Sequence, residues 1–265
     1  MYIKTFNSKG IIVGLDASRC RSGGAINHLI GILNAGNPQL HSISKIHIWA
    51  YKALIDQLPD LNWLCKHTHP YLERSLFWQI WWQYYYLPKE LKKYNCNILY
   101  SADAGTVYLH NPMVVFNQDA LSYEYGIMKK FGFSLDRLRL SLLLYIQNRS
   151  IKYAKGVIFL TKYSARLIQT SVGKLTNFTN IPHGIDPAFS QLPNPRVWPK
   201  DITESIQCIY VSDAAIYKNH QFVIRALKEL RNKGYNLKLH LIGATSGSGQ
   251  RYLHKEICNS DPNGL

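Results

Sequence analysis

Residues 181–189 read Ile-Pro-His-Gly-Ile-Asp-Pro-Ala-Phe, and they separate two series of alternating strand-like and helix-like segments. The next segment, Leu192–Ser205, carries three prolines: Pro193, Pro195 and Pro199. Proline fixes φ and lacks a backbone N–H, so it can neither continue a helix nor sit in a central strand. This segment is therefore predicted to be a stiff linker that runs over the surface between two domains.

The linker sets the predicted domain organisation. We expect a first domain over residues 1–190, the proline-rich linker over 191–205 and a second domain over 206–265. Within the quoted stretch, His183 and Gly184 are predicted to form a turn in which glycine supplies a positive φ. Such a turn is equally compatible with a hinge beside an active cleft.

The composition is typical of a globular protein: 265 residues, 46% hydrophobic and 18% charged. No apolar run approaches the roughly 18–20 residues that span a bilayer, and the first ten residues lack the apolar region of a signal peptide. The five cysteines are scattered without a Cys-x-x-Cys pair, which argues against a zinc site or a disulfide framework. Such cysteines favour a reducing compartment, so we expect a cytoplasmic protein.

The formal net charge is +15, which predicts an anionic partner: nucleic acid, an anionic membrane or a phosphorylated substrate. The densest basic region is 129–155, where a helix with an apolar stripe is predicted over Ser134–Ala154. Its basic residues, against Asp136 alone, are Lys129, Lys130, Arg137, Arg139, Arg149, Lys152 and Lys155. A solvated face, or contact with anionic lipid or a diphosphate-bearing acceptor, would explain this region. Nucleic acid is disfavoured because no recognised motif is present.

The first half begins with a short apolar run, Gly10–Leu15, which is typical of a buried parallel strand. Gly23 and Gly24 follow, and helical spacing begins at Ala25. A strand, a glycine loop and a helix in succession can aim backbone N–H groups at an anion. The spacing is not Gly-x-Gly-x-x-Gly, so the dinucleotide-binding motif is absent.

About seven strands alternate with helices in the first half, which predicts a mostly parallel sheet. Further strands are predicted at Lys45–Ala50, Trp63–Thr68, Ile98–Ala102, Val107–His110, Val114–Phe116, Val157–Leu160 and Phe178–Ile181. His110 ends one of them before an Asn-Pro turn, where it is well placed to face a cleft at the carboxyl edge of the sheet. A histidine that simply hydrogen-bonds to nearby backbone is the alternative. The aromatic-rich helix in Glu73–Tyr94, interrupted by Pro88, is predicted to be largely buried, with an interfacial helix as the alternative.

The second half opens with a predicted strand at Ile206–Ser212. Lys218 and Asn219 then precede a predicted helix over Gln221–Arg231, and Asn219 is a good N-cap residue. A lysine beside the unsatisfied N–H groups of a helix N-terminus is typical of a phosphate site. A further strand is predicted at Leu237–Ile242.

Taken together, these segments resemble the GT-B glycosyltransferases, in particular the retaining family 4, also called group 1. The resemblance rests on the quoted 181–189 stretch and extends from Gly14–Ala17 to Tyr210–His220, which is most of the chain. It implies an α/β fold with two Rossmann-like, doubly wound parallel sheets. It also implies transfer of a sugar, with retention, from a nucleoside diphosphate sugar to a glycan or lipid-linked acceptor, with no metal and no cofactor.

The resemblance also implies roles for particular residues. Gly23, Gly24, Lys218 and Asn219 would bind the donor diphosphate, and His110 would be catalytic, facing the sugar or the acceptor hydroxyl. His183 and Gly184 would line the hinge and cleft. Expected partners are the nucleotide sugar and the acceptor, but no nucleic acid; peripheral contact with the inner face of an anionic membrane is left open.

Two departures from the family pattern affect this interpretation. Asp213 stands where many members carry an arginine that holds the diphosphate. The family's pair of glutamates seven residues apart, which grips the donor sugar and ribose, has no counterpart before Leu265. We therefore expect a second domain that is truncated and a 265-residue chain with little transferase activity. The alternative is an inactive remnant that serves as a basic module binding a membrane surface or a partner.

Overall fold

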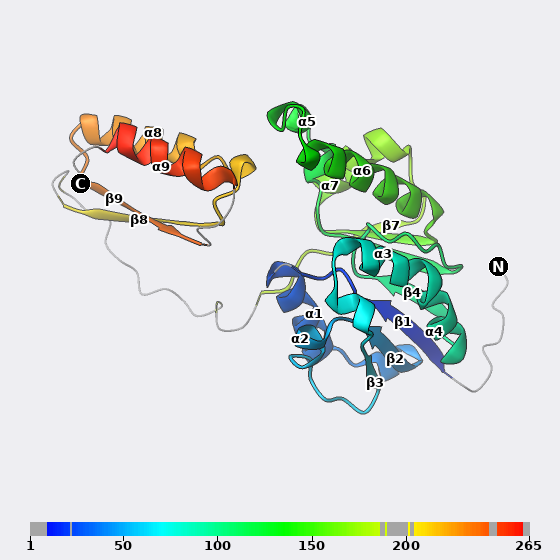
Figure 1. Ribbon diagram of the computed structural model, residues 1–265. Coiled ribbons are helices and arrows are strands. Elements are labelled where there is room, and N and C mark those ends of the chain that lie inside the picture. The colour runs from blue at the N-terminus through cyan, green and yellow to red at the C-terminus, as the bar shows by residue number, and fades with distance from the viewer. Residues whose placement is uncertain are drawn as a thin grey trace. The chain divides into compact units, whose positions relative to one another are not determined.

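The computed structural model describes residues 10–21, 23–185, 189, 201, 204–243 and 248–261. The chain divides into two compact units, Met1–Ser190 and Gln191–Leu265 (Figure 1). The three prolines of the predicted linker, and the residues Asp186–Ala188 of the quoted stretch, lie outside the described residues. In the described part of the chain, no helix is both long and apolar enough to cross a membrane.

The first unit is built on a seven-stranded sheet in which all neighbouring strands are parallel, in the order β3-β2-β1-β4-β5-β6-β7. The strands are β1 (Ile11–Asp16), β2 (Ile43–Trp49), β3 (Leu64–His67), β4 (Ile98–Ser101), β5 (Met113–Asn117), β6 (Gly156–Phe159) and β7 (Phe178–Asn180). The predicted parallel α/β fold is thus confirmed.

Helices connect these strands. They are α1 (Gly23–Ala35), α2 (Lys52–Ile55), α3 (Leu76–Tyr85), α4 (Leu87–Lys93), α5 (Ile127–Lys130), α6 (Leu135–Tyr153) and α7 (Lys162–Val172), with short 3-10 helices at Pro38–His41, Pro70–Glu73 and Leu121–Tyr123. The chain steps outward from β1 in one direction through β2 to β3, and in the other through β4 to β7. Because crossovers are right-handed, α1 and α2 cover one face of the sheet, and α3, α4, α6 and α7 cover the other.

Local signals in the sequence explain several helix boundaries. Pro88 lies in the first turn of α4, where its missing N–H costs nothing, and the aromatic segment therefore divides into α3 and α4. Ser134 caps α6 by accepting a hydrogen bond from the Arg137 backbone N–H. Thr161 and Ser164 form a reciprocal capping box at the start of α7.

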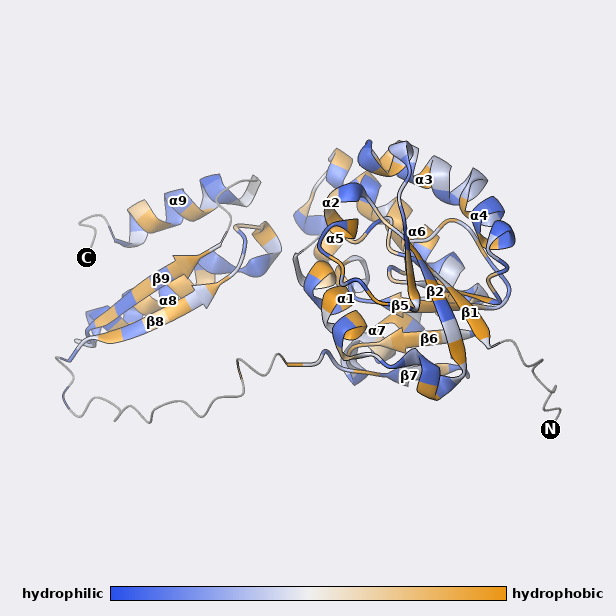
Figure 2. Cartoon of the chain, turned by 90° about the horizontal axis from the view of Figure 1, so that it is seen from below, coloured by the Kyte–Doolittle hydropathy of each residue, from blue (hydrophilic) through white to orange (hydrophobic). Residues whose placement is uncertain are grey.

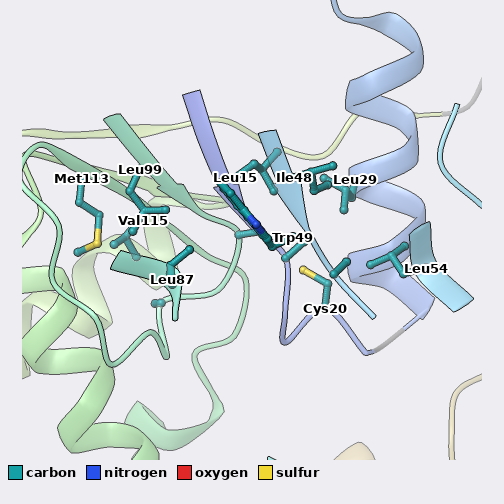
Figure 3. Close-up of a cluster of buried hydrophobic side chains, with 14 of the residues drawn as sticks. Leu15, Cys20, Leu29, Ile48, Trp49, Leu54, Leu87, Leu99, Met113 and Val115 are labelled. Carbon is teal, nitrogen blue, oxygen red and sulfur yellow. The ribbon is translucent and has the colours of Figure 1, made fainter. Parts of the chain in front are cut away.

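The core lies between the sheet and the helices on both faces (Figure 3). Leu99, Met113 and Val115 are fully buried in the central strands, and Leu87 reaches them from α4. Gly14, in the middle of β1, has no room for a side chain. A Cβ there would lie 2.2 Å from Leu91 Cδ2, so the contact between β1 and α4 depends on glycine.

The prediction of a strand over Val107–His110 is wrong. These residues form no ladder, because the neighbouring position beside β4 is taken by β5, which pairs Leu99 with Met113. The segment instead brings the chain back from the end of β4 to the start of β5. Its Val107 carbonyl accepts a hydrogen bond from the Arg149 side chain at 3.4 Å.

The prediction that the aromatic helix is largely buried is only partly right. Trp82 is fully buried, and Trp78 is half-buried. The outer face of α3, however, leaves Phe77 and Trp81 exposed, at 63% and 40%, together with Tyr84 and Tyr85. One face of a two-sided apolar helix suffices to cover the sheet, so the second face remains in solvent.

The second unit contains a two-stranded parallel sheet of β8 (Ile206–Val211) and β9 (Leu237–Ile242). Its helices are α8 (His220–Asn232) and α9 (Ser248–Ser260), with a 3-10 helix, η5, at Ile216–Lys218. Figure 1 shows both long helices on one face of the sheet, and Figure 2 shows apolar residues along both strands. Arg225 joins the two helices through a bidentate pair with Glu256, at 2.8 and 2.7 Å.

Candidate functional site

The carboxyl ends of the strands in the first unit carry a group of polar side chains. Asp16, the last residue of β1, is buried, and the Ser18 backbone N–H and the Gln83 amide donate to its carboxylate at 3.0 and 2.7 Å. Burial raises the pKa of the Asp16 carboxyl above its ordinary value, and these hydrogen bonds partly oppose that rise. Asp16 therefore orders the turn that leads from β1 toward α1.

A second contact ties this turn to the loop after β4. Arg19 lies 3.5 Å from Asp103, measured from Nε to Oδ2, and its guanidinium also donates to the Gly105 carbonyl. Both partners are substantially buried, with side chains 13% and 33% exposed. Arg19 is consequently engaged within the protein and is not offered to a ligand as a free cation.

Gly23 and Gly24, predicted from the sequence as an anion-binding loop, form the first turn of α1. A Cβ built on either would meet no atom within 4 Å, and both are exposed. The first turn of α1 carries no acidic residue. Among the described residues, this turn therefore combines open space at both glycines with no acidic side chain of its own, which suits the approach of a ligand anion.

One turn further along α1, His28 contacts His183, and their Nδ1 atoms are 2.8 Å apart. The His28 ring also lies against Phe116, with centroids 4.8 Å apart. Burial, and secondarily the neighbouring His183, lowers the pKa of His28, so this imidazole is neutral at neutral pH. His183 was predicted from the sequence, but His28 was missed because its partner is 155 residues away and no local pattern connects them.

An apolar groove of about 470 Å³ continues from His28 along the α1 face of the sheet. Its floor is formed by side chains of β4 and β5, among them Ile98, Tyr100, Val114 and Phe116. The groove exists because α1 and α2 cover only the β1–β3 side of this face. Within the described residues, no helix covers β4 and β5 here.

His110 does not join this group. It lies three residues before β5, whose first residue pairs with Leu99 near the start of β4. It is therefore at the amino ends of these strands, whereas Asp16 is the last residue of β1 and Gly23 follows that strand. The expectation that His110 faces a cleft at the carboxyl edge depended on the incorrect strand and is corrected. Burial lowers the pKa of its imidazole.

Two asparagines mark the carboxyl edge further along the sheet. Asn117 and Asn180 flank Phe159 in the register of β5, β6 and β7, so all three side chains point to the same face. Both Asn117 side-chain polar atoms and the Asn180 Oδ1 are buried without a partner among the described residues. No local pattern signals this arrangement, because it arises from pairing between distant strands.

In the second unit, Lys218 and Asn219 lie at the N-terminus of α8. Lys218 is exposed, and its Nζ is 5.4 Å from the centroid of the Tyr217 ring. The Tyr210 hydroxyl donates to the Lys218 carbonyl at 2.6 Å and fixes the backbone of the turn. The 13-residue helix α8 therefore begins beside an exposed cation, with no acidic residue in its first turn.

Asn219 occupies the N-cap position, as predicted, but its side chain makes no capping hydrogen bond. Its φ is 60°, in the left-handed region, whereas a capping side chain requires extended backbone at this position. The Asn219 side chain thus caps none of the N–H groups of the first turn, although the Phe222 N–H donates to the Asn219 carbonyl at 3.0 Å. His220, which follows, is buried against Tyr210, with ring centroids 4.9 Å apart.

Asp213 lies in the loop between β8 and η5. Its side chain is exposed, and the Ser212 hydroxyl lies 3.4 Å from its Oδ1. No salt bridge joins it to Lys218 within the described part of the second unit. Across the described residues of both units, no group of three His, Cys, Asp or Glu side chains is placed to hold a metal ion.

No protein-family model and no curated protein matches the chain. Solved structures do. HepE of Anabaena in complex with UDP and glucose has a TM-score of 0.57 at 17% identity, over 96% of this chain and 67% of that one. The same protein with UDP-glucose has a TM-score of 0.56 at 17% identity, over 94% of this chain and 66% of that one. The lipopolysaccharide outer core galactosyltransferase WaaB, in its apo form, has a TM-score of 0.51 at 12% identity, over 94% of this chain and 64% of that one.

These similarities show the fold. The seven-stranded sheet of the first unit and the parallel sheet of the second have the GT-B architecture of these glycosyltransferases, with the described second sheet reduced to two strands. The chain spans about two thirds of the length of the structures it matches.

Proposed function

We propose that this protein is a glycosyltransferase that uses a nucleoside diphosphate sugar, and that the nucleotide is UDP. Two observations support this proposal, the first for UDP and the second for a diphosphate. Structures of the same fold hold UDP with glucose, or UDP-glucose. The second unit also presents the elements that a diphosphate requires at one helix end.

The observation that carries the proposal is the N-terminus of α8. Lys218 supplies an exposed positive charge, and the uncapped N–H groups after Asn219 supply hydrogen-bond donors and the positive end of the helix dipole. When the sugar leaves, negative charge accumulates on the diphosphate. Donors that are already in place stabilise that charge more in the transition state than in the ground state, which is how they accelerate transfer.

The first unit contains groups suited to the phosphate and to the acceptor. The open backbone at Gly23 and Gly24 allows close approach of a phosphate group. The neutral His28, held by His183, can accept a proton from an acceptor hydroxyl. The sequence had led us to expect His110, and not His28, to face the sugar or the acceptor hydroxyl. The apolar groove beside His28 suits a lipid-linked acceptor, since hydrocarbon leaves water when it binds there.

The finer parts of the proposal follow the family resemblance of the sequence. We propose transfer with retention, as in family 4, to a glycan or lipid-linked acceptor, in the cytoplasm and without a metal. Proton NMR of the released or transferred sugar identifies the anomer that forms first. An inverted first product would exclude the retaining assignment and leave the diphosphate site untouched.

The diphosphate site is tested by calorimetric titration of the 265-residue chain with UDP and with UMP. Lys218→Ala should weaken UDP binding by ~1.5–3 kcal/mol, the usual size for a hydrogen bond to a charged group, which is about tenfold to a hundredfold. Lys218→Arg should restore it only in part, because the guanidinium has a different donor geometry. Lys218→Ala should weaken the binding of UMP, which lacks the second phosphate, less than it weakens the binding of UDP.

Lys233→Ala is the matched control. Lys233 is an exposed lysine at the other end of the same helix, in the C-cap position. This variant has the same loss of charge and should leave the UDP affinity within about twofold. Equal losses for both variants would mean that only net charge matters, and an unchanged affinity in a folded Lys218→Ala protein would remove Lys218 from the site.

A further inference from the structure

The segment Tyr125–Tyr145 of the first unit exposes an unusual number of large apolar side chains. Figure 1 shows α5 and the beginning of α6 projecting outward from the body of this unit. The exposed fractions are 97% for Tyr125, 104% for Phe133, 84% for Leu135, 66% for Leu138, 55% for Leu142 and 67% for Tyr145. These six residues are the apolar part of what we call the α5–α6 surface.

This exposure departs from the usual helix pattern. The C-terminal half of α6 buries Ile151 together with two polar residues: Gln147 accepts a hydrogen bond from the Ser122 hydroxyl at 3.2 Å, and Ser150 donates to the Ala104 carbonyl. Meanwhile Leu135, Leu138, Leu142 and Tyr145 lie on one helical stripe and face solvent. An amphipathic helix normally buries its apolar stripe, so this stripe is arranged to contact something other than its own core.

Basic side chains border the apolar ones. The basic part of the α5–α6 surface is Lys129, Lys130, Arg137 and Arg139. In the described residues, none of these four forms a salt bridge. The Arg137 guanidinium lies 5.4 Å from the centroid of the Phe133 ring, so cation and aromatic side chain stand together at the tip.

We propose that the α5–α6 surface docks on an anionic lipid membrane. A stripe of exposed apolar side chains bordered by cations matches the boundary between headgroups and acyl chains, where apolar side chains enter the membrane and cations meet phosphate. A nucleic acid would match the charge but not the leucines. A protein partner would favour an apolar patch with few charged residues at its centre, whereas lysines and arginines border these apolar side chains.

The chain supplies its own control surface. The outer face of α3 is also aromatic, with Phe77, Trp81, Tyr84 and Tyr85 exposed, but α3 itself contains no basic residue. Arg74, just before the helix, lies over the half-buried Trp78 ring, 5.2 Å from its centroid. If aromatic exposure alone drove membrane binding, α3 would serve as well as α6. If aromatic and basic residues must stand together, as proposed, only the α5–α6 surface will bind.

The test is flotation of the full chain with vesicles of phosphatidylcholine alone, and with vesicles that also contain about 30% phosphatidylglycerol as the anionic lipid. We expect binding to the anionic vesicles at least about tenfold stronger than to the neutral ones, and weakened by salt. Phe133→Ser with Leu138→Ser should reduce it by about tenfold or more. Phe77→Ser with Trp81→Ser should leave it within about twofold. All four side chains are exposed, so neither pair removes core packing.

A reporter variant places the contact directly. The sequence has no tryptophan between 83 and 197, so Phe133→Trp adds a single probe at the tip. Its emission should shift to the blue and be quenched by brominated lipid in anionic vesicles. The proposal is overturned if the chain binds no vesicles, binds neutral and anionic vesicles equally, or loses binding through the α3 pair instead. Nucleotide titration plays no part in this test, so its failure is separate from failure of the diphosphate site.

Discussion

Gly14→Ala should destabilise the first unit, because α4 leaves no room for a side chain at that position of β1. The new Cβ would lie 2.2 Å from Leu91 Cδ2, where ordinary contact begins at 3.4 Å, and 3.3 Å from the Trp49 ring. Leu91 and Trp49 are themselves buried, so neither can swing into solvent. Overpacking costs ~1–3 kcal/mol, and the lower chain entropy of alanine returns ~0.5–1 kcal/mol. We expect a net loss of about 1–2 kcal/mol.

A double-mutant cycle tests whether Leu91 is the side chain responsible. Leu91→Ala alone should cost ~2–5 kcal/mol through the cavity it creates. In the double variant the methyl group introduced by Gly14→Ala occupies part of that cavity, so the combined loss should fall short of the sum by roughly 1–2 kcal/mol. Urea unfolding followed by tryptophan fluorescence measures this, since five of the six tryptophans, all but Trp198, lie in the first unit. Strict additivity would refute the close contact between Gly14 and Leu91.

Two further predictions concern the aromatic side chains of the first unit. His47 and His67 are 2.9 Å apart between ring nitrogens, and burial lowers the pKa of both, that of His67 to about 4. Because the unfolded chain then binds more protons, the stability from this pair is complete above pH ~6.5 and is lost as the pH falls toward about 4. Allowing for the partial exposure of His67, the loss in the free energy of unfolding is about 1–2 kcal/mol. His67→Phe should flatten the dependence of urea unfolding on pH. An unchanged pH dependence in this variant would contradict the prediction. For the tryptophans, acrylamide should quench Trp81 and spare Trp82, so Trp81→Phe should lower the quenchable fraction of the emission and Trp82→Phe should raise it.

Much of the fold could be predicted because it is encoded locally. Short apolar runs such as Gly10–Leu15 predicted strands, and their alternation with helices predicted a parallel sheet. Pro88 ended one helix and began the next, as proline in a first turn does. The strand predicted at Val107–His110 is absent because apolar character alone does not determine which segment pairs with β4. The pairing partner of β4 depends on the arrangement of the whole sheet.

The site was harder to predict, because its contacts are long-range. His183 was chosen from its own motif, but its partner His28 lies in α1 and shows no signal near it in the sequence. Asn219 was correctly placed at the start of α8, yet its left-handed backbone, and with it the missing side-chain cap, could not be read from residue type. The α3 and α6 stripes were visible as patterns. Which side of each helix faces solvent required the packed structure.

The central claim, that the N-terminus of α8 binds a nucleoside diphosphate, is tested most directly by a ¹⁵N–¹H NMR titration of the chain with UDP. We expect the largest chemical-shift changes in the second unit at Lys218, Asn219 and His220, with little change at the C-terminal end of α8. In Lys218→Ala these changes should require a UDP concentration about tenfold to a hundredfold higher. Changes confined to other residues, or none at saturating UDP, would contradict the claim.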